Sequence, residues 1–167
     1  MAGSKTKPPA QSVPAPTRVR MQASYVPDGT KLKFLPWSFA DTRLRRAHNY
    51  WVCSTRPDGR PHAAPVWGLW SERAFYFSTD PSSQKGRNLA LNPAIVVHVE
   101  SADEVVIIEG RAEVFELDKT LDAAYFRKYK VHLLGFEAPM VIFRVPAQVV
   151  MAWREKTFSA STTRWQF

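Results

Sequence analysis

The sequence predicts a mainly β protein, folded as a small barrel of short antiparallel strands. Three observations indicate this class. Short runs rich in β-branched and aromatic residues recur along most of the chain, separated by Gly, Pro, Asp and Ser. Only three segments have a helical pattern, and each falls in a connection between strands. The chain has 167 residues, of which 45% are hydrophobic, enough for one domain with a sizeable core. This combination favours a barrel over a sandwich or a parallel α/β sheet.

The expected strands cover residues 50–55, 61–70, 74–79, 94–100, 104–116, 140–145 and 148–153. The expected helices cover residues 39–48, 83–91 and 118–130, where apolar residues recur at intervals of three and four. Arg56-Pro57-Asp58-Gly59 is a turn sequence that would join the first two strands as a hairpin. Gly110, inside a long β run, predicts a bulge. Ser38 and Asp41 have the spacing of a capping box at the first helix start.

The N-terminal part of the chain differs in composition from the remainder. Residues 1–24 are rich in Pro, Ser, Ala and Gln and cannot bury enough apolar surface to offset their ordering entropy, so we expect them to be disordered. We divide the chain into a basic, Pro-rich tail over residues 1–33 and a folded domain over residues 34–167. Of the net charge of +8, the tail carries +5. The near balance in the domain argues against nucleic acid as a partner.

Composition also indicates the cellular compartment and argues against a metal site. The chain has no apolar run long enough to span a bilayer and no apolar core of a secretory signal at its start. A single cysteine, Cys53, excludes an intrachain disulfide framework, so the cytoplasm is the expected location and no membrane is expected as a partner. The four histidines share no metal-ligand spacing, so we expect no metal site.

A candidate phosphate site begins where the strand ending in Ser78 and Thr79 is followed by a Pro-Ser-Ser loop. The next helix carries Lys85 and Arg87 in its first turns. Free backbone N–H groups and the positive end of the helix dipole gather at a helix start, where hydroxyl and cationic side chains complete an anion site. The alternative is a solvated helix start in which Ser82 or Ser83 is a simple N-cap.

The chain offers no convincing acid, base or nucleophile of its own, so its catalytic residues are unknown. The motifs of serine hydrolases, P-loop kinases and Rossmann dehydrogenases are all missing. A phosphate site beside aromatic strands instead suits an enzyme whose cofactor brings the chemistry. Arg164 and Trp165 near the C-terminus could give a cation and a flat surface to a ligand with a ring and an anion, or the terminus could only fill a groove.

Seven segments in register resemble the pyridoxamine 5′-phosphate oxidase-like, FMN-binding split β-barrel proteins, and in particular their branch that uses the deazaflavin coenzyme F420. The match runs in order over residues 34–167. The segments are Trp37-Ser38 to Asn49-Tyr50-Trp51, Arg56 to His62, Pro65 to Gly68, Phe75 to Thr79, Lys85-Gly86-Arg87-Asn88-Leu89, Asn92-Pro93 and Thr163 to Phe167.

The resemblance implies a split β-barrel homodimer with two cofactor sites at the interface. In such proteins the strand that matches Pro65, Val66 and Trp67 runs along the flavin ring and ribityl chain. The positions of Ser78 and Thr79 approach the phosphate.

The positions of Ser83, Gln84 and Lys85 match the family's Ser-Arg-Lys phosphate motif. Lys85 is retained, while Gln84 replaces the usual Arg and Gly86 the usual Ala. The first change removes one phosphate cation, and the second is expected to loosen the helix. Arg164 and Trp165 match the terminal motif and complete the expected cofactor-binding residues.

The resemblance therefore predicts an oxidoreductase that uses F420 for hydride transfer to or from a small conjugated substrate. Two alternatives stay open: an FMN-dependent enzyme of the pyridoxamine 5′-phosphate oxidase type, and a non-catalytic flavin or deazaflavin carrier. Both cofactors carry a phosphate beyond a ribityl-like chain, so the phosphate site does not distinguish them.

Overall fold

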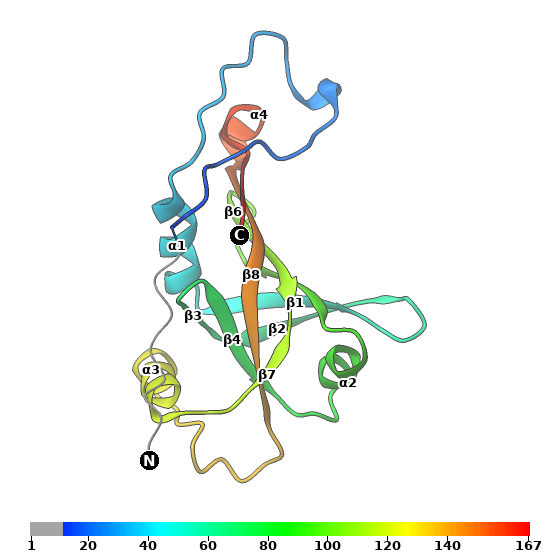
Figure 1. Ribbon diagram of the computed structural model, residues 1–167, viewed down its shortest axis with the longest axis vertical. Coiled ribbons are helices and arrows are strands. Elements are labelled where there is room, and N and C mark those ends of the chain that lie inside the picture. Colours follow the sequence, from blue (N-terminus) through cyan, green and yellow to red (C-terminus); the bar gives the residue numbers. More distant parts are fainter. Residues whose placement is uncertain (1–11) are drawn as a thin grey trace.

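The computed structural model describes residues 12–167 as a mainly β fold built around one curled, antiparallel, nine-stranded sheet (Figure 1). The strands are β1 (Asn49–Thr55), β2 (Pro61–Trp67), β3 (Leu69–Ser71), β4 (Ala74–Thr79), β5 (Ala94–Val99), β6 (Glu104–Arg111), β7 (Glu113–Phe115), β8 (Val141–Arg154) and β9 (Thr163–Gln166). Their order is β2-β1-β5-β6-β8-β4-β3, with β7 and β9 also paired to β8. The predicted mainly β split-barrel fold is confirmed.

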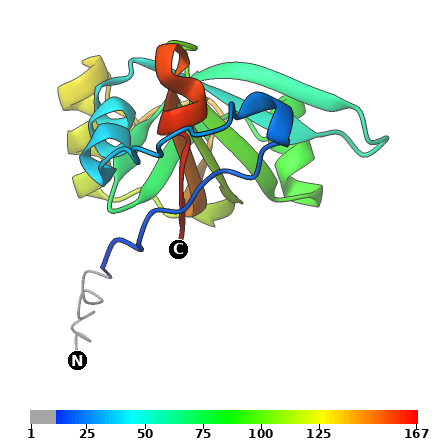
Figure 2. The same ribbon diagram turned by 90° about the horizontal axis from the view of Figure 1, so that it is seen from above.

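The helices occupy the connections, as the sequence predicts. They are α1 (Trp37–Arg46), α2 (Gln84–Leu91), α3 (Lys119–Tyr129) and α4 (Phe158–Ser161), with short 3₁₀ turns at Ala23–Tyr25 and Glu155–Thr157. Figures 1 and 2 show α1 and α3 on one side of the molecule, and α2 beside the β1–β2 hairpin on the other. The candidate phosphate loop, between β4 and α2, therefore lies next to this hairpin.

Strand β8 connects the two parts of the sheet and corrects one prediction. Residues 140–145 and 148–153 were expected as two strands, but β8 is continuous through Pro146. The strand changes neighbours there: Pro146 is opposite Ala74 of β4, and Ala147 is opposite Gly110 of β6. The missing N–H of proline is tolerated at such an irregular position. The predicted bulge at Gly110 is confirmed by a register shift, and a Cβ there would lie 2.5 Å from the Pro146 carbonyl oxygen.

The core lies between the inner faces of the curled sheet. Side chains with at most 1% exposure include Leu44, Tyr50, Val52, Phe75, Phe77, Val97, Val106, Ile108, Val145, Val150 and Trp165. A second, smaller apolar cluster joins α3 to β3, β4 and β8, and it includes Leu69, Leu121, Tyr125, Leu133 and Ile142. This second cluster packs α3 against the sheet.

Helix α1 begins earlier than the sequence predicts, and the expected capping box is wrong. The N-cap is Pro36, which makes no side-chain cap. Ser38 therefore lies inside the first turn. The Asp41 carboxylate accepts a hydrogen bond from the Trp70 indole N–H at 2.9 Å and from Arg45 at 2.8 Å. Asp41 thus connects α1 to β3 instead of closing the helix start.

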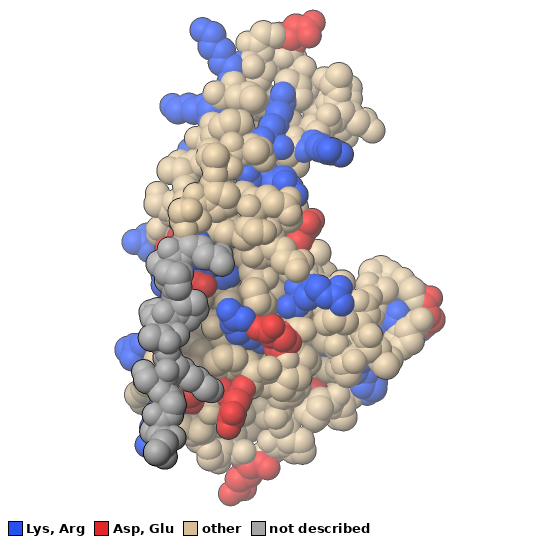
Figure 3. Space-filling view, viewed as in Figure 1, with Lys and Arg blue, Asp and Glu red and all other residues tan. Residues whose placement is uncertain are grey.

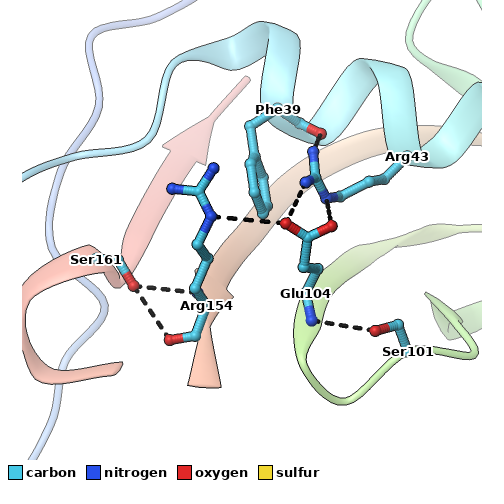
Figure 4. A network of polar contacts seen from close by, with 6 residues as sticks. All are labelled: Phe39, Arg43, Ser101, Glu104, Arg154 and Ser161. Atoms are coloured by element: carbon cyan, nitrogen blue, oxygen red, sulfur yellow. Dashed lines mark hydrogen bonds and ion pairs between the residues drawn. The ribbon is translucent and has the colours of Figure 1, made fainter. Parts of the chain in front are cut away.

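Glu104, at the start of β6, lies between two arginines from different elements (Figure 4). Arg43 of α1 donates its Nε–H to Glu104 at 3.0 Å, and Arg154 at the end of β8 lies 3.6 Å away. The Arg43 guanidinium also stacks 3.3 Å above the Phe39 ring. Hydrogen bonding to Arg43 keeps the pKa of Glu104 below its usual range. This network holds α1 against the end of the sheet.

The expected disorder of residues 1–24 is corrected at Thr17. Residues 1–11 lie outside the described residues. Thr17 exchanges two backbone hydrogen bonds with Arg164 of β9, at 2.8 and 2.7 Å, because β9 offers a free edge there. Beyond this bridge, residues 18–34 form a loop above α4 (Figure 1). Figure 3 shows several Lys and Arg side chains over this upper part, with others spread over the lower part of the same face. The division of the chain at residue 33 stays a prediction.

Candidate functional site

The start of α2 has the hydroxyl groups and free N–H groups of an anion site. Ser83 is the N-cap: its Oγ accepts the Gly86 N–H at 3.1 Å and lies 2.9 Å from Thr79 Oγ1. Ser82 instead donates to Asp80. Among residues 12–167, the N–H groups of Gln84 and Lys85 have no hydrogen-bond partner. The cap therefore leaves two donors at the positive end of the helix dipole.

Basic residues of α2 and of the β1–β2 hairpin lie near this helix start. Lys85 is half-buried and has no hydrogen-bond or ion-pair partner in the described part of the chain. His62 of β2 has a buried Nδ1 without a partner, and Arg56 of the hairpin has a buried, unpaired Nε. Burial, and then the charges of Arg56 and Lys85, lower the pKa of His62. Hydrogen bonds from Ser82, and then the charge of Lys85, lower the pKa of the nearby Asp80 carboxyl, so Lys85 faces one carboxylate of the loop. The unpaired donors of this region together with the cations Lys85 and Arg56 fit a bound phosphate.

The close packing of the α2 start on the preceding loop explains why position 86 is a glycine, which the resemblance did not predict. A Cβ at this position would lie 2.6 Å from the Asp80 carbonyl oxygen and 2.7 Å from that of Pro81. An alanine, usual in the related motif, would therefore require the loop to move. Glycine lets the helix start pack directly on the loop. The expectation that it also loosens the helix stays a prediction.

Strand β2 extends from the candidate phosphate site along the edge of the sheet. Its partner is β1, and its other edge carries no strand in the described chain. Pro65 has no N–H, so it fits an edge where every second residue points its backbone groups outward. From His62 to Trp67 the strand covers about 17 Å at roughly 3.3 Å per residue. Pro65 and Trp67 are exposed and Val66 is buried, so the first two face solvent beside β1.

Aromatic side chains build the far end of β2. The Trp67 ring is 41% exposed and stacks on Tyr129 of α3, with centroids 4.7 Å apart and planes at 7°. The Tyr129 hydroxyl accepts the Gly68 N–H at 2.9 Å and contacts the His48 carbonyl at 2.7 Å. A Cβ at Gly68 would lie 2.3 Å from the Phe75 ring. The expected strand 61–70 is therefore interrupted at Gly68, where the chain turns from β2 into β3.

Two predicted phosphate-site residues, Ser78 and Gln84, lie elsewhere than expected. Ser78 and Thr79 are adjacent on β4, so their side chains point to opposite faces. Thr79 faces Ser83, whereas Ser78 faces Tyr125 and Leu121 of α3, away from the candidate phosphate loop. Gln84 is bonded within its own helix: its amide donates to Asn88 at 2.7 Å. The predicted phosphate contact of Ser78 is corrected on this ground.

The two predicted C-terminal site residues, Arg164 and Trp165, also lie on opposite faces of one strand, β9. Trp165 is 1% exposed and packs edge-on against Trp37 at 5.3 Å, so its assignment as a ligand surface is corrected. Arg164, on the other face of β9, is partly exposed. Arg164 pairs with Met151 of β8, whereas Thr79, at the candidate phosphate loop, pairs with Val141 at the other end of the same strand. Ten residues of β8 correspond to about 30 Å, so Arg164 lies far from the phosphate loop of its own chain.

Sequence reasoning missed several groups at this site. Arg56 and His62 fall in the quoted hairpin segment, but their positions beside Lys85 depend on how α2 packs on the sheet. Tyr129 and His48 are distant from Trp67 in sequence and meet it only through the fold. Among residues 12–167 there is no group of three His, Cys, Asp or Glu side chains that could hold a metal. None of the described helices is long and apolar enough to cross a membrane.

The structure is thus a split β-barrel with a candidate anion site at one end of the edge strand β2 and an exposed aromatic ring at the other. Residues 39–153 match the sequence profile of the pyridoxamine 5′-phosphate oxidase family. The chain therefore belongs to this flavin-binding family, as the sequence predicted. A search of the curated proteins finds no match.

Solved structures share the fold at low sequence identity. General Stress Protein 26 from Bacillus anthracis is 23% identical over 69% of this chain and 91% of its own, with a TM-score of 0.58. A conserved hypothetical protein from Mycobacterium tuberculosis is 18% identical over 77% and 89%, with a TM-score of 0.60. An F420 reductase is 22% identical over 75% and 98%, with a TM-score of 0.55.

Proposed function

We propose that this protein is an oxidoreductase that binds coenzyme F420 and exchanges a hydride between its deazaflavin ring and a small conjugated substrate. The observation that carries the proposal is the candidate anion site at the start of α2, where Lys85 forms no hydrogen bond or ion pair with the described residues. Strand β2 leads from this site to the exposed ring of Trp67. Its length of about 17 Å suits a ligand with a phosphate, a chain and a planar ring.

Each part of the site has a separate task in this proposal. Lys85 and the free N–H groups bind the phosphate, with Ser83 and Thr79 supplying hydroxyls. Pro65 and Trp67 position the ring on one face and keep water from it. The bound coenzyme supplies the hydride chemistry. No protein acid or base is required, because protons can come from solvent.

The choice of deazaflavin over FMN is supported by the resemblance of seven segments to the F420 branch. A structural neighbour named F420 reductase is consistent with it, although at 22% identity it shows only the shared fold. Gln84, bonded to Asn88, does not supply the arginine of the FMN-type motif. An FMN-dependent enzyme and a non-catalytic carrier are the other outcomes of the tests.

The test begins with the protein as purified. The absorption spectrum and mass of any co-purified molecule should identify a deazaflavin, and the reduced form should transfer its hydride to an added acceptor. A co-purified FMN would favour the oxidase alternative. A bound coenzyme that exchanges no hydride with a panel of conjugated acceptors would favour the carrier.

We also propose that the protein works as a homodimer whose second copy covers the outer face of β1, β2 and β5. This face carries no charged side chain. Its register places Trp51 between Pro65 and His98, and Cys53 between Ala63 and Val96. Trp51 is 37% exposed. An uncharged, largely apolar sheet face beside a ligand site is typical of an interface, and a second copy there could complete the site.

Replacing Trp51 with Glu should convert the dimer to a monomer, because it would bury an unpaired charge at the centre of this face. Light scattering coupled to size-exclusion chromatography measures the change. Trp51→Phe is the matched control and should remain dimeric. A Trp51→Glu protein that stays dimeric would place the interface elsewhere.

A further inference from the structure

Lys128 of α3 reaches into the end of the barrel and contacts two other elements. Its Nζ donates to the Tyr50 hydroxyl of β1 at 2.8 Å and to the Gly68 carbonyl at 2.9 Å. It also lies 4.7 Å from the centroid of the Tyr50 ring and 5.1 Å from that of Tyr129. An ammonium has three N–H donors. The third donor of Lys128 has no partner in residues 12–167.

This ammonium has no counter-ion within the described chain. The titratable groups that face it are Tyr50 on β1, Tyr129 on its own helix and, beyond the Tyr129 ring, Tyr125 and His48. No carboxylate forms an ion pair with it. Burial lowers the pKa of Lys128 to about 8. The side chain is therefore mostly charged at neutral pH, although nothing near it neutralises the charge.

The position of Lys128 connects it to the candidate site. Gly68, whose carbonyl it contacts, directly follows Trp67 on the chain. Tyr129, the next residue of α3, stacks on Trp67 and accepts the Gly68 N–H. The charge of Lys128 thus lies at the Trp67 end of β2, whereas the candidate phosphate site lies at the other end of this strand. A half-buried cation kept without a counter-ion at such a place is a functional signal.

We propose that the Lys128 ammonium is the cation that faces the electron-rich edge of the bound coenzyme's ring and stabilises negative charge there. This inference rests on the proposed function, because it requires a ring at Trp67. Two cations would then bind one ligand at its two ends, Lys85 at the phosphate and Lys128 at the ring. Positive charge beside a flavin-type ring is a known means of adjusting its electronics.

The sign of the pH effect follows from linkage. A ligand with negative charge near Lys128 favours the charged ammonium and so raises the pKa of Lys128 above its value of about 8 in the free protein. Binding at pH 8 should then take up a proton, to a maximum of about half a proton per site. The affinity should fall as the pH rises above 8.

The experiment is isothermal titration calorimetry of the full chain with coenzyme F420 at pH 8, in two buffers of different ionisation enthalpy. The wild type should take up a fraction of a proton. Lys128→Met should bind at least about tenfold more weakly at pH 7 and take up none. Lys128→Arg keeps the charge without titrating, so it should bind well, show no uptake and keep its affinity from pH 7 to 9.

The outcomes separate this inference from the function on which it rests. Proton uptake that is the same in the wild type and both variants would leave Lys128 a purely structural clamp and overturn the inference, while the proposed function would stand. If Lys128→Met fails to fold, Lys128→Arg decides: retained uptake overturns the inference. If the folded wild type binds neither F420 nor FMN, both proposals are overturned.

Discussion

Replacing Trp165 with Ala should lower the free energy of unfolding by about 3–5 kcal/mol, the usual cost of truncating a buried Trp. The indole is 1% exposed, packs against Trp37 and lies on a strand that is hydrogen-bonded to β8. Its removal would leave a cavity that the surrounding sheet cannot close. Denaturation by urea, followed by circular dichroism, measures the loss.

Arg164→Ala is the matched control, because Arg164 lies on the other face of the same strand and is partly exposed. It should change the stability little. The reverse pattern, with a tolerant Trp165 and a sensitive Arg164, would contradict the burial described for β9. If Arg164→Ala instead weakens coenzyme binding at normal stability, the C-terminal arginine contributes to the site of a partner chain, since it is far from its own.

Lys85→Ala should weaken coenzyme binding by at least about tenfold, because a charge-assisted hydrogen bond to phosphate contributes roughly 1.5–3 kcal/mol. The stability of the folded protein should change little, because Lys85 forms no hydrogen bond or ion pair among residues 12–167. Fluorescence titration of the apoprotein measures the affinity, and the difference from the wild type should shrink at high salt.

Lys119→Ala is the control for Lys85, since it removes an equal charge from an exposed position at the start of α3. It should leave the affinity unchanged. Equal midpoints for Lys85→Ala and the wild type would remove the phosphate assignment from the α2 start.

The sequence predicted the fold class and most elements because their signals are local. The turn at Arg56-Pro57-Asp58-Gly59 and the bulge at Gly110 depend on a few adjacent residues, and both are present. The continuity of β8 through Pro146 could not be predicted, because it depends on which strands flank that position. Strand β9 was missed for a similar reason: it depends on pairing with β8.

The candidate site was predicted in part, and strand alternation explains some of the errors. Adjacent residues of a strand point to opposite faces, so Ser78 with Thr79, and Arg164 with Trp165, could not share one ligand surface. The sequence alone could have predicted that these pairs point apart. It could not have predicted the contact of Lys128 with Gly68, because this contact joins α3 to a residue 60 positions earlier on the chain.

The most direct test of the account is a titration of the apoprotein with coenzyme F420 and, separately, with FMN. The account predicts saturable binding of F420 at one molecule per chain, tighter than that of FMN and weakened by Lys85→Ala. Binding of neither cofactor to the folded protein, or F420 binding that does not depend on Lys85, would contradict it.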